Sequence, residues 1–167
     1  MAQKIVPYLW FDKEAGEAAT LYADLFKSRP GTPTGESKVI EVSRYTEAGP
    51  GEAGAAMVVT FELEGEEFIA LNGGPQFSFT EAFSIFVRCE SQEEVDYFWN
   101  ALTADGGEES QCGWLKDRFG LSWQIIPNRL MELIGDPDPG RAQRAMQAML
   151  QMQKIDVAEL ERAADAA

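Results

Sequence analysis

The first half of the chain alternates between a strand-like and a helix-like spacing of apolar residues. Residues 5–11 (IVPYLWF) are rich in β-branched and aromatic side chains and predict a strand. Residues 13–27 place apolar side chains on one helical face, and Asp12 before them is the expected N-cap. Strand-like segments follow at 38–45, 57–63 and 67–71. Between the last two, Glu64–Gly65–Glu66 predicts a tight hairpin turn.

The second half repeats this order of elements. Residues 82–89 predict a strand and residues 91–104 a helix, which Ser91 and Glu94 would begin as a capping box. Strand-like material returns at 108–115 and 121–126. A strand–helix–strands unit therefore occurs twice, with a period of roughly 75–80 residues. One unit alone would leave a sheet face uncovered, so we expect the two to combine.

The C-terminal segment has a different pattern. Asp138 followed by Pro139 predicts a helix start, and Asp156 predicts the start of another helix at 157–166. Four methionines belong to this region, namely Met131, Met146, Met149 and Met152. Methionines at helical spacing indicate packing in a core or against a partner. We therefore expect a single domain over residues 1–167, with module one at about 3–75, module two at about 80–127 and C-terminal helices at about 128–166.

Composition narrows the classes of partner. Hydrophobic residues make up 45% of the 167 residues, which suffices for a core, and the net charge is −14. A surface with this much negative charge repels phosphate backbones and anionic lipids. We therefore expect neither a nucleic-acid nor a membrane partner. The two cysteines indicate no disulfide framework, and no signal-like or membrane-spanning stretch is visible. These features predict a cytoplasmic protein.

Four segments resemble a known family. PYLWFD at 7–12, FELEGEEFIALNGGP at 61–75, QCGWLKDRFGLSWQIIP at 111–127 and the DPDP segment with its methionine-rich continuation are similar to PhnB-like proteins. That family is also labelled 3-demethylubiquinone-9 3-methyltransferase domain, and it belongs to the vicinal-oxygen-chelate (glyoxalase/bleomycin-resistance) superfamily. The resemblance implies an α+β fold of two paired βαβββ modules plus C-terminal helices. It also implies sheets curled into an open cup that holds a pocket, and a homodimer.

The metal site of that superfamily has no counterpart in these residues. Its metal-dependent members hold a divalent ion with His and Glu side chains on the first and last strands of each module. This sequence contains no histidine. Matching GLSWQI to the family pattern puts Gln124 at the glutamate position, and the matching strand of module one ends in Asn72. Because a neutral amide is a poor metal ligand, we expect no metal and no cofactor.

Apolar walls with a few polar groups are typical of a site for a small organic molecule. The predicted ligand-binding residues are Trp10, Phe68, Asn72, Ser84, Phe86, Trp114 and Gln124. The alternative for each aromatic residue is ordinary core packing, and by strand parity Trp123 points away from Gln124 and packs against a helix. No catalytic residue is identified. Cys112 has no histidine to deprotonate it, which favours a structural role.

Three functional hypotheses follow. The first is a small-molecule-binding protein of the PhnB-like family, without a catalytic metal and of unknown activity. The second is an enzyme, either a metal-dependent lyase or dioxygenase relative or, as the family label suggests, a quinone methyltransferase. No helix is predicted after Gly73–Gly74, so the glycine-rich loop of common methyltransferases is missing. The third is an interaction protein whose methionine-rich helices bind a partner.

Overall fold

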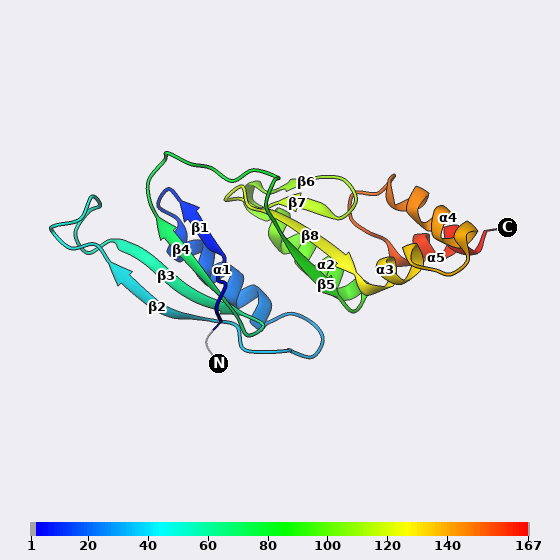
Figure 1. Cartoon of the computed structure of the whole chain (residues 1–167), viewed down its shortest axis with the longest axis horizontal. Helices are drawn as coiled ribbons and strands as arrows, with labels where there is room; N and C mark the ends of the chain where they lie inside the picture. The colour runs from blue at the N-terminus through cyan, green and yellow to red at the C-terminus, as the bar shows by residue number, and fades with distance from the viewer. Residues whose placement is uncertain (1–2, 167) are drawn as a thin grey trace. The chain divides into compact units, whose positions relative to one another are not determined.

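The computed structural model describes residues 3–166, which form two compact units that divide between Phe79 and Thr80 (Figure 1). Each unit is described by itself. The unit boundary falls between the two modules that the repeated element order predicts.

The first unit is a four-stranded sheet with one helix. Its elements are β1 (Tyr8–Phe11), α1 (Ala15–Lys27), β2 (Lys38–Arg44), β3 (Ala56–Leu63) and β4 (Glu66–Asn72). The strand order is β1-β4-β3-β2, in which β1 and β4 are parallel and the other pairs antiparallel. This is a βαβββ module, as expected, although β1 begins three residues later than the apolar run suggests.

Alternation along the strands separates a helix-covered face from an open one. Leu9, Phe61, Phe68 and Ala70 point to the α1 side and are buried. The rings of Phe61 and Phe68 stack with centroids 5.4 Å apart, and Tyr22 of α1 lies against Phe61. On the opposite face, Tyr8 of β1 is 56% exposed. The helix thus buries one face of the sheet, as an apolar stripe on a helix does in any two-layer fold.

The hairpin between β3 and β4 has the predicted tight turn. Leu63 pairs with Glu66, and the two residues between them, Glu64 and Gly65, both have positive φ. The Glu64 carboxylate accepts hydrogen bonds from Arg29 Nε at 2.7 Å and from the Thr34 amide at 2.6 Å. Burial alone would raise the pKa of Glu64, but these hydrogen bonds and the Arg29 charge lower it to about 2.

The N-terminus of α1 is capped by a side chain from a distant strand. Asp12 was expected to be the cap, and this prediction is wrong. The residue at the cap position is Glu14, whose side chain makes no cap hydrogen bond. Instead Asn72, at the end of β4, accepts a hydrogen bond at Oδ1 from the Ala15 amide at 2.7 Å. Its Nδ2 donates to the Ala56 carbonyl at 3.1 Å, so one amide links β3, β4 and α1.

The second unit repeats the architecture of the first. It contains β5 (Ser84–Cys89), α2 (Gln92–Thr103), the short 3₁₀ turn η1 (Ala104–Gly106), β6 (Glu108–Glu109), β7 (Trp114–Lys116) and β8 (Ser122–Pro127). The order β5-β8-β7-β6 matches that of the first sheet, with β5 and β8 parallel. Ser91 Oγ accepts from the Glu94 amide, which confirms the predicted cap of α2.

The strand expected at residues 108–115 is interrupted. β6 ends at Glu109, and Cys112 and Gly113, with left-handed φ values of 58° and 83°, turn the chain directly before β7 begins. Farther along, Trp123 is fully buried, and its Nε1 donates to the Asp117 carboxylate at 2.9 Å. Trp123 stands opposite Leu115 in the strand register, on the other face of β8 from Gln124, and its packing against a helix stays a prediction.

Three helices follow β8: α3 (Asn128–Ile134), α4 (Pro139–Met149) and α5 (Val157–Asp165). Asp138 and Asp156 cap the last two, as predicted, whereas α3 was not expected as a separate helix. Their own apolar core consists of Ile126, Leu130, Leu133, Ala145, Ile155, Leu160 and Ala164. Met149 and Met152 pack against this core, while Met131 is 51% and Met146 39% exposed.

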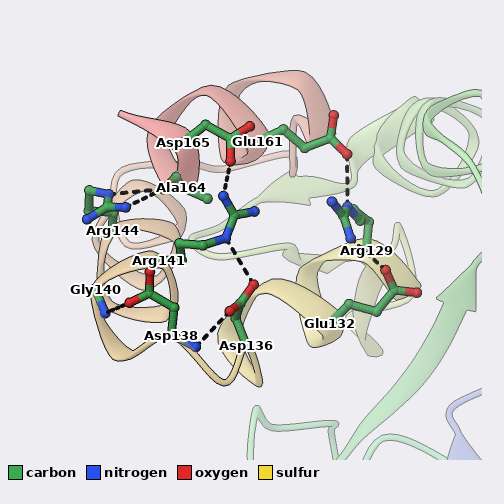
Figure 2. A network of polar contacts seen from close by, with 10 residues as sticks. All are labelled: Arg129, Glu132, Asp136, Asp138, Gly140, Arg141, Arg144, Glu161, Ala164 and Asp165. Atoms are coloured by element: carbon green, nitrogen blue, oxygen red, sulfur yellow. Dashed lines mark hydrogen bonds and ion pairs between the residues drawn. The ribbon is translucent and has the colours of Figure 1, made fainter. Parts of the chain in front are cut away.

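Arginines fasten these helices to one another (Figure 2). Arg129 of α3 donates to Glu161 of α5 at 2.8 Å. Arg141 of α4 bridges Asp136 in the preceding turn and Asp165 of α5. Arg144 donates twice to the Ala164 carbonyl, where it satisfies a backbone oxygen at the end of α5. The three helices are therefore held as one bundle by polar contacts around a small apolar core.

The segment between α4 and α5 binds this bundle to the rest of the second unit. The amides of Cys112 and Gly113 donate to the carbonyls of Met152 and Gln153, each at 2.8 Å. The Gln92 side chain of α2 donates to the Ile155 carbonyl at 3.0 Å and accepts from the Val157 amide at 2.9 Å. The C-terminal helices thus form part of the second unit.

Replacing Asn72 should destabilise the first unit. Asn72→Ala removes the α1 cap and the bond to Ala56, and we expect a loss of about 1–2 kcal/mol in the free energy of unfolding. Asn72→Asp keeps the acceptor for Ala15 and should recover part of the loss. Asp12→Ala is the matched control, and urea unfolding is the measurement. An Asp12→Ala loss as large as that of Asn72→Ala would contradict this assignment of the cap.

Stability should fall with acid through Glu64. Its folded pKa lies near 2, below the value of about 4.3 in an unfolded chain, so its contribution is complete above about pH 4.5 and disappears as the pH falls towards 2. We expect Glu64→Gln to lower the free energy of unfolding by roughly 1–3 kcal/mol at neutral pH and by much less near pH 2.5. Urea titrations across this range measure the difference. Glu66→Gln, at an exposed neighbour, is the control. A Glu64→Gln loss that is the same at both ends of the range would refute the linkage.

Candidate functional site

Six side chains form two rows on the face of the second sheet that α2 does not cover. Strand pairing places Phe86 opposite Gln124 and Gln124 opposite Trp114, which makes one row across β5, β8 and β7. The second row, one pleat away, contains Ser84, Ser122 and Lys116. We call these six residues the open face. Four of the seven predicted ligand-binding residues, Ser84, Phe86, Trp114 and Gln124, therefore lie together.

The open face combines aromatic surface with a polar pair. Phe86 is 42% exposed, and the Arg88 guanidinium lies 6.0 Å from its ring centroid. Gln124 Nε2 donates to Ser84 Oγ at 2.9 Å, so the two polar side chains of adjacent strands orient each other. A planar apolar group could stack in this row while the amide and hydroxyl fix its direction.

A recess of about 120 Å³ opens beside these rows. It is lined by Glu81, Glu108, Glu109, Ser110, Trp114, Leu115, Lys116 and Ser122. Lys116 Nζ lies 2.6 Å from Glu81 Oε1. The hydrogen bond with Glu81 and the charge of that carboxylate raise the pKa of Lys116, and the reciprocal contact lowers the pKa of Glu81. Sequence reasoning missed Lys116 and Ser122 as site residues, although strand parity puts Ser122 on the side of Gln124.

The three remaining predicted residues belong to the first unit and divide between its faces. Trp10 lies on the open side of β1, where its Nε1 donates to the Gly74 carbonyl at 2.9 Å and its ring meets Phe77 edge-on at 5.0 Å. A Cβ at Gly73 would overlap the Trp10 indole, so this packing requires glycine. Phe68 and Asn72 point to the α1 side, in the stacking and capping contacts described above. Their contact with a ligand stays a prediction.

A larger pocket of about 580 Å³ lies in the first unit, between the start of α1, the loop around Tyr45 and residues 72–76. Asn72 lines it, but both ends of its amide are engaged with backbone groups. The Tyr45 hydroxyl donates to the Asn72 carbonyl. Only one of the seven predicted residues therefore borders this pocket, and the polar groups of that residue are already used.

The residues do not fit a divalent metal ion. The sequence has no histidine. Over residues 3–166, no three Cys, Asp or Glu side chains lie close enough together to hold an ion. At the position that resembles a metal-binding glutamate stands Gln124, and its amide is hydrogen-bonded to Ser84. Neutral amides offer a metal neither the charge nor the basicity of carboxylate or imidazole.

Comparison with known sequences identifies the family. The profile described as 3-demethylubiquinone-9 3-methyltransferase matches residues 3–126, about three quarters of the chain. The chain belongs to this PhnB-like family. Membership confirms the resemblance to PhnB-like proteins that was inferred from the sequence. The two βαβββ modules with their helices confirm the predicted α+β fold class.

Solved structures agree with this family assignment. A PhnB protein from Bacillus cereus is 34% identical, with a TM-score of 0.65, over 75% of this chain and 99% of that protein. Protein PA1353 from Pseudomonas aeruginosa is 22% identical, with a TM-score of 0.57, over 75% and 98% of the two chains. Among curated proteins none matches. The family match ends at residue 126, so α3, α4 and α5 of this PhnB-like chain lie beyond it.

Within residues 3–166, no helix combines the length and apolar character that crossing a membrane requires.

We expect this PhnB-like protein to retain far less than one equivalent of Mn²⁺, Ni²⁺ or Zn²⁺ after incubation with each ion and desalting, because no described cluster of ligands holds one. Elemental mass spectrometry of the desalted protein gives the stoichiometry. One tightly held equivalent that Gln124→Leu removes would overturn the argument.

Proposed function

We propose that this PhnB-like protein binds a small organic molecule with a planar, largely apolar part on the open face of its second sheet, without a catalytic metal. One observation carries the proposal. Phe86, Gln124 and Trp114 stand side by side on three paired strands, with the Ser84 hydroxyl bonded to the central amide. Aromatic walls with a few convergent polar groups are the usual composition of a small-molecule site.

A ligand that stacks on this row is more favourable than leaving the row exposed to water. A ligand that covers the exposed part of Phe86 and the neighbouring Trp114 gains roughly 25 cal/mol for each Å² of apolar surface removed from water. Aromatic pairs add about 0.5–1.5 kcal/mol when they stack offset or edge-to-face. Within the described chain, Gln124 Oε1 accepts no hydrogen bond, so it can receive one from a ligand.

Two further expectations from the sequence belong to the same proposal. We propose that the protein is a homodimer, which the family resemblance implies, and that it works in the cytoplasm.

The family description provides a second candidate, methyl transfer to a quinone. Residues 73–83, after the Gly73–Gly74 pair, contain no helix, so the glycine-rich strand-to-helix loop of common S-adenosylmethionine enzymes is missing from that place. Calorimetry with S-adenosylmethionine tests this candidate directly. Binding of this cofactor would favour the enzyme, and no heat together with no thermal shift would remove it.

A fragment titration tests the leading proposal. Small aromatic compounds that carry a hydrogen-bond donor should shift the Trp114 indole and Gln124 amide resonances in two-dimensional NMR spectra of the full chain. Trp114→Ala and Phe86→Ala should each weaken binding about tenfold, since each removes one stacking surface. Met131→Ala, at an exposed apolar residue of α3, is the control and should leave the affinity unchanged. Fragment shifts that avoid Trp114 and Gln124, or an equal loss in all three variants, would refute the site.

A further inference from the structure

Ser122 is a buried hydroxyl without a partner. The residue is 1% exposed, and its Oγ makes no hydrogen bond within residues 3–166. Buried polar atoms in folded proteins nearly always have a partner, and an exception calls for an explanation such as an unseen ligand. Ser122 also lines the recess of about 120 Å³ beside Trp114. The hydroxyl lies at the wall of the recess but is closed off from water, so a molecule in the recess reaches it only when the neighbouring side chains move.

An ion pair spans the strand that carries this hydroxyl. Lys116 lies on β7, and its partner Glu81 precedes β5, while β8 with Ser122 runs between these two strands. The pair and Ser122 line the same recess. The side chains of Glu81 and Lys116 are 64% and 34% exposed, so this contact is at the surface and can rearrange when a ligand enters.

The net charge of the recess determines whether it favours a positively or a negatively charged ligand group. Two carboxylates, those of Glu81 and Glu108, face the single ammonium of Lys116 in the recess. The Glu109 carboxylate points to the other face, where it accepts a hydrogen bond from Trp99 Nε1 of α2 at 2.8 Å. A carboxylate or phosphate group would meet this excess of negative charge, whereas a cation gains from it. Trp114 lines the recess as well, and indole is the aromatic side chain that attracts cations most.

We propose that this recess receives a protonated amino group of the ligand whose planar part lies on Phe86 and Trp114. The recess of about 120 Å³ has room for an ammonium group with a short carbon stem. Ser122 Oγ accepts one ammonium hydrogen, and Glu81 and Glu108 balance the charge. This inference rests on the proposed function and adds the chemical class of its ligand, an alkylamine that carries an aromatic ring.

Three probes with the same ring and different head groups test the inference: 2-phenylethylamine, 2-phenylethanol and 3-phenylpropanoate. NMR titration of the full chain gives each affinity from the shift of the Trp114 indole signal. We expect the amine to bind about tenfold more tightly than the alcohol, and the carboxylate to bind most weakly. Glu108→Gln should weaken only the amine, by about three- to tenfold, and Glu93→Gln on the exposed face of α2 is the control with the same change of charge.

Ser122→Ala separates binding from folding. Because it removes an unpartnered buried hydroxyl, it should leave the melting temperature unchanged or higher, while the amine binds about fivefold more weakly. Equal affinities for the amine and the alcohol, with the Trp114 signal still shifting, would overturn the amine inference and leave the proposed function intact. If none of the three probes shifts the Trp114 signal, both proposals fail. A Glu93→Gln loss as large as that of Glu108→Gln would also overturn the inference, because it would show only a general effect of charge.

Discussion

In each unit the first and last strands pair in parallel, so the chain between them must cross over the sheet, and this connection contains a helix. That helix covers one face of the sheet, so side-chain alternation decides which residues are core and which remain on the other side. Trp123 and Gln124 are adjacent in sequence and have opposite surroundings for this reason. The membership of the open face follows from the same pairing.

Local pattern in the sequence was sufficient for most elements. The duplicated βαβββ order, the hairpin turn at Glu64–Gly65 and the caps Ser91, Asp138 and Asp156 are all encoded within a few residues. The start of α1 was not, because its cap Asn72 is brought there by β4. The break at Cys112 also escaped prediction, since a cysteine rarely adopts a left-handed conformation and the backbone bonds that hold it come from residues 152 and 153.

The residues of the candidate site were likewise predictable only in part. Parity within a strand indicated that Ser84 and Phe86 share a face, and that Trp123 and Gln124 do not. Which residues stand opposite one another depends on register, and single strands carry little information about it. The recess depends on a still longer connection, the ion pair of Lys116 with a glutamate that precedes β5. The sequence therefore predicted the aromatic row but not the charged recess next to it.

The backbone bonds between the turn at Cys112–Gly113 and the segment before α5 couple two parts of the second unit. Trp114 follows that turn directly, so the strand that carries it shares hydrogen bonds with the helices beyond the family match. Amide protons on both sides should consequently exchange with solvent in one cooperative opening rather than in two. Relatives that lack such helices would have to order the same strand by other contacts. The free energy needed to open this strand can therefore differ between proteins that share the fold.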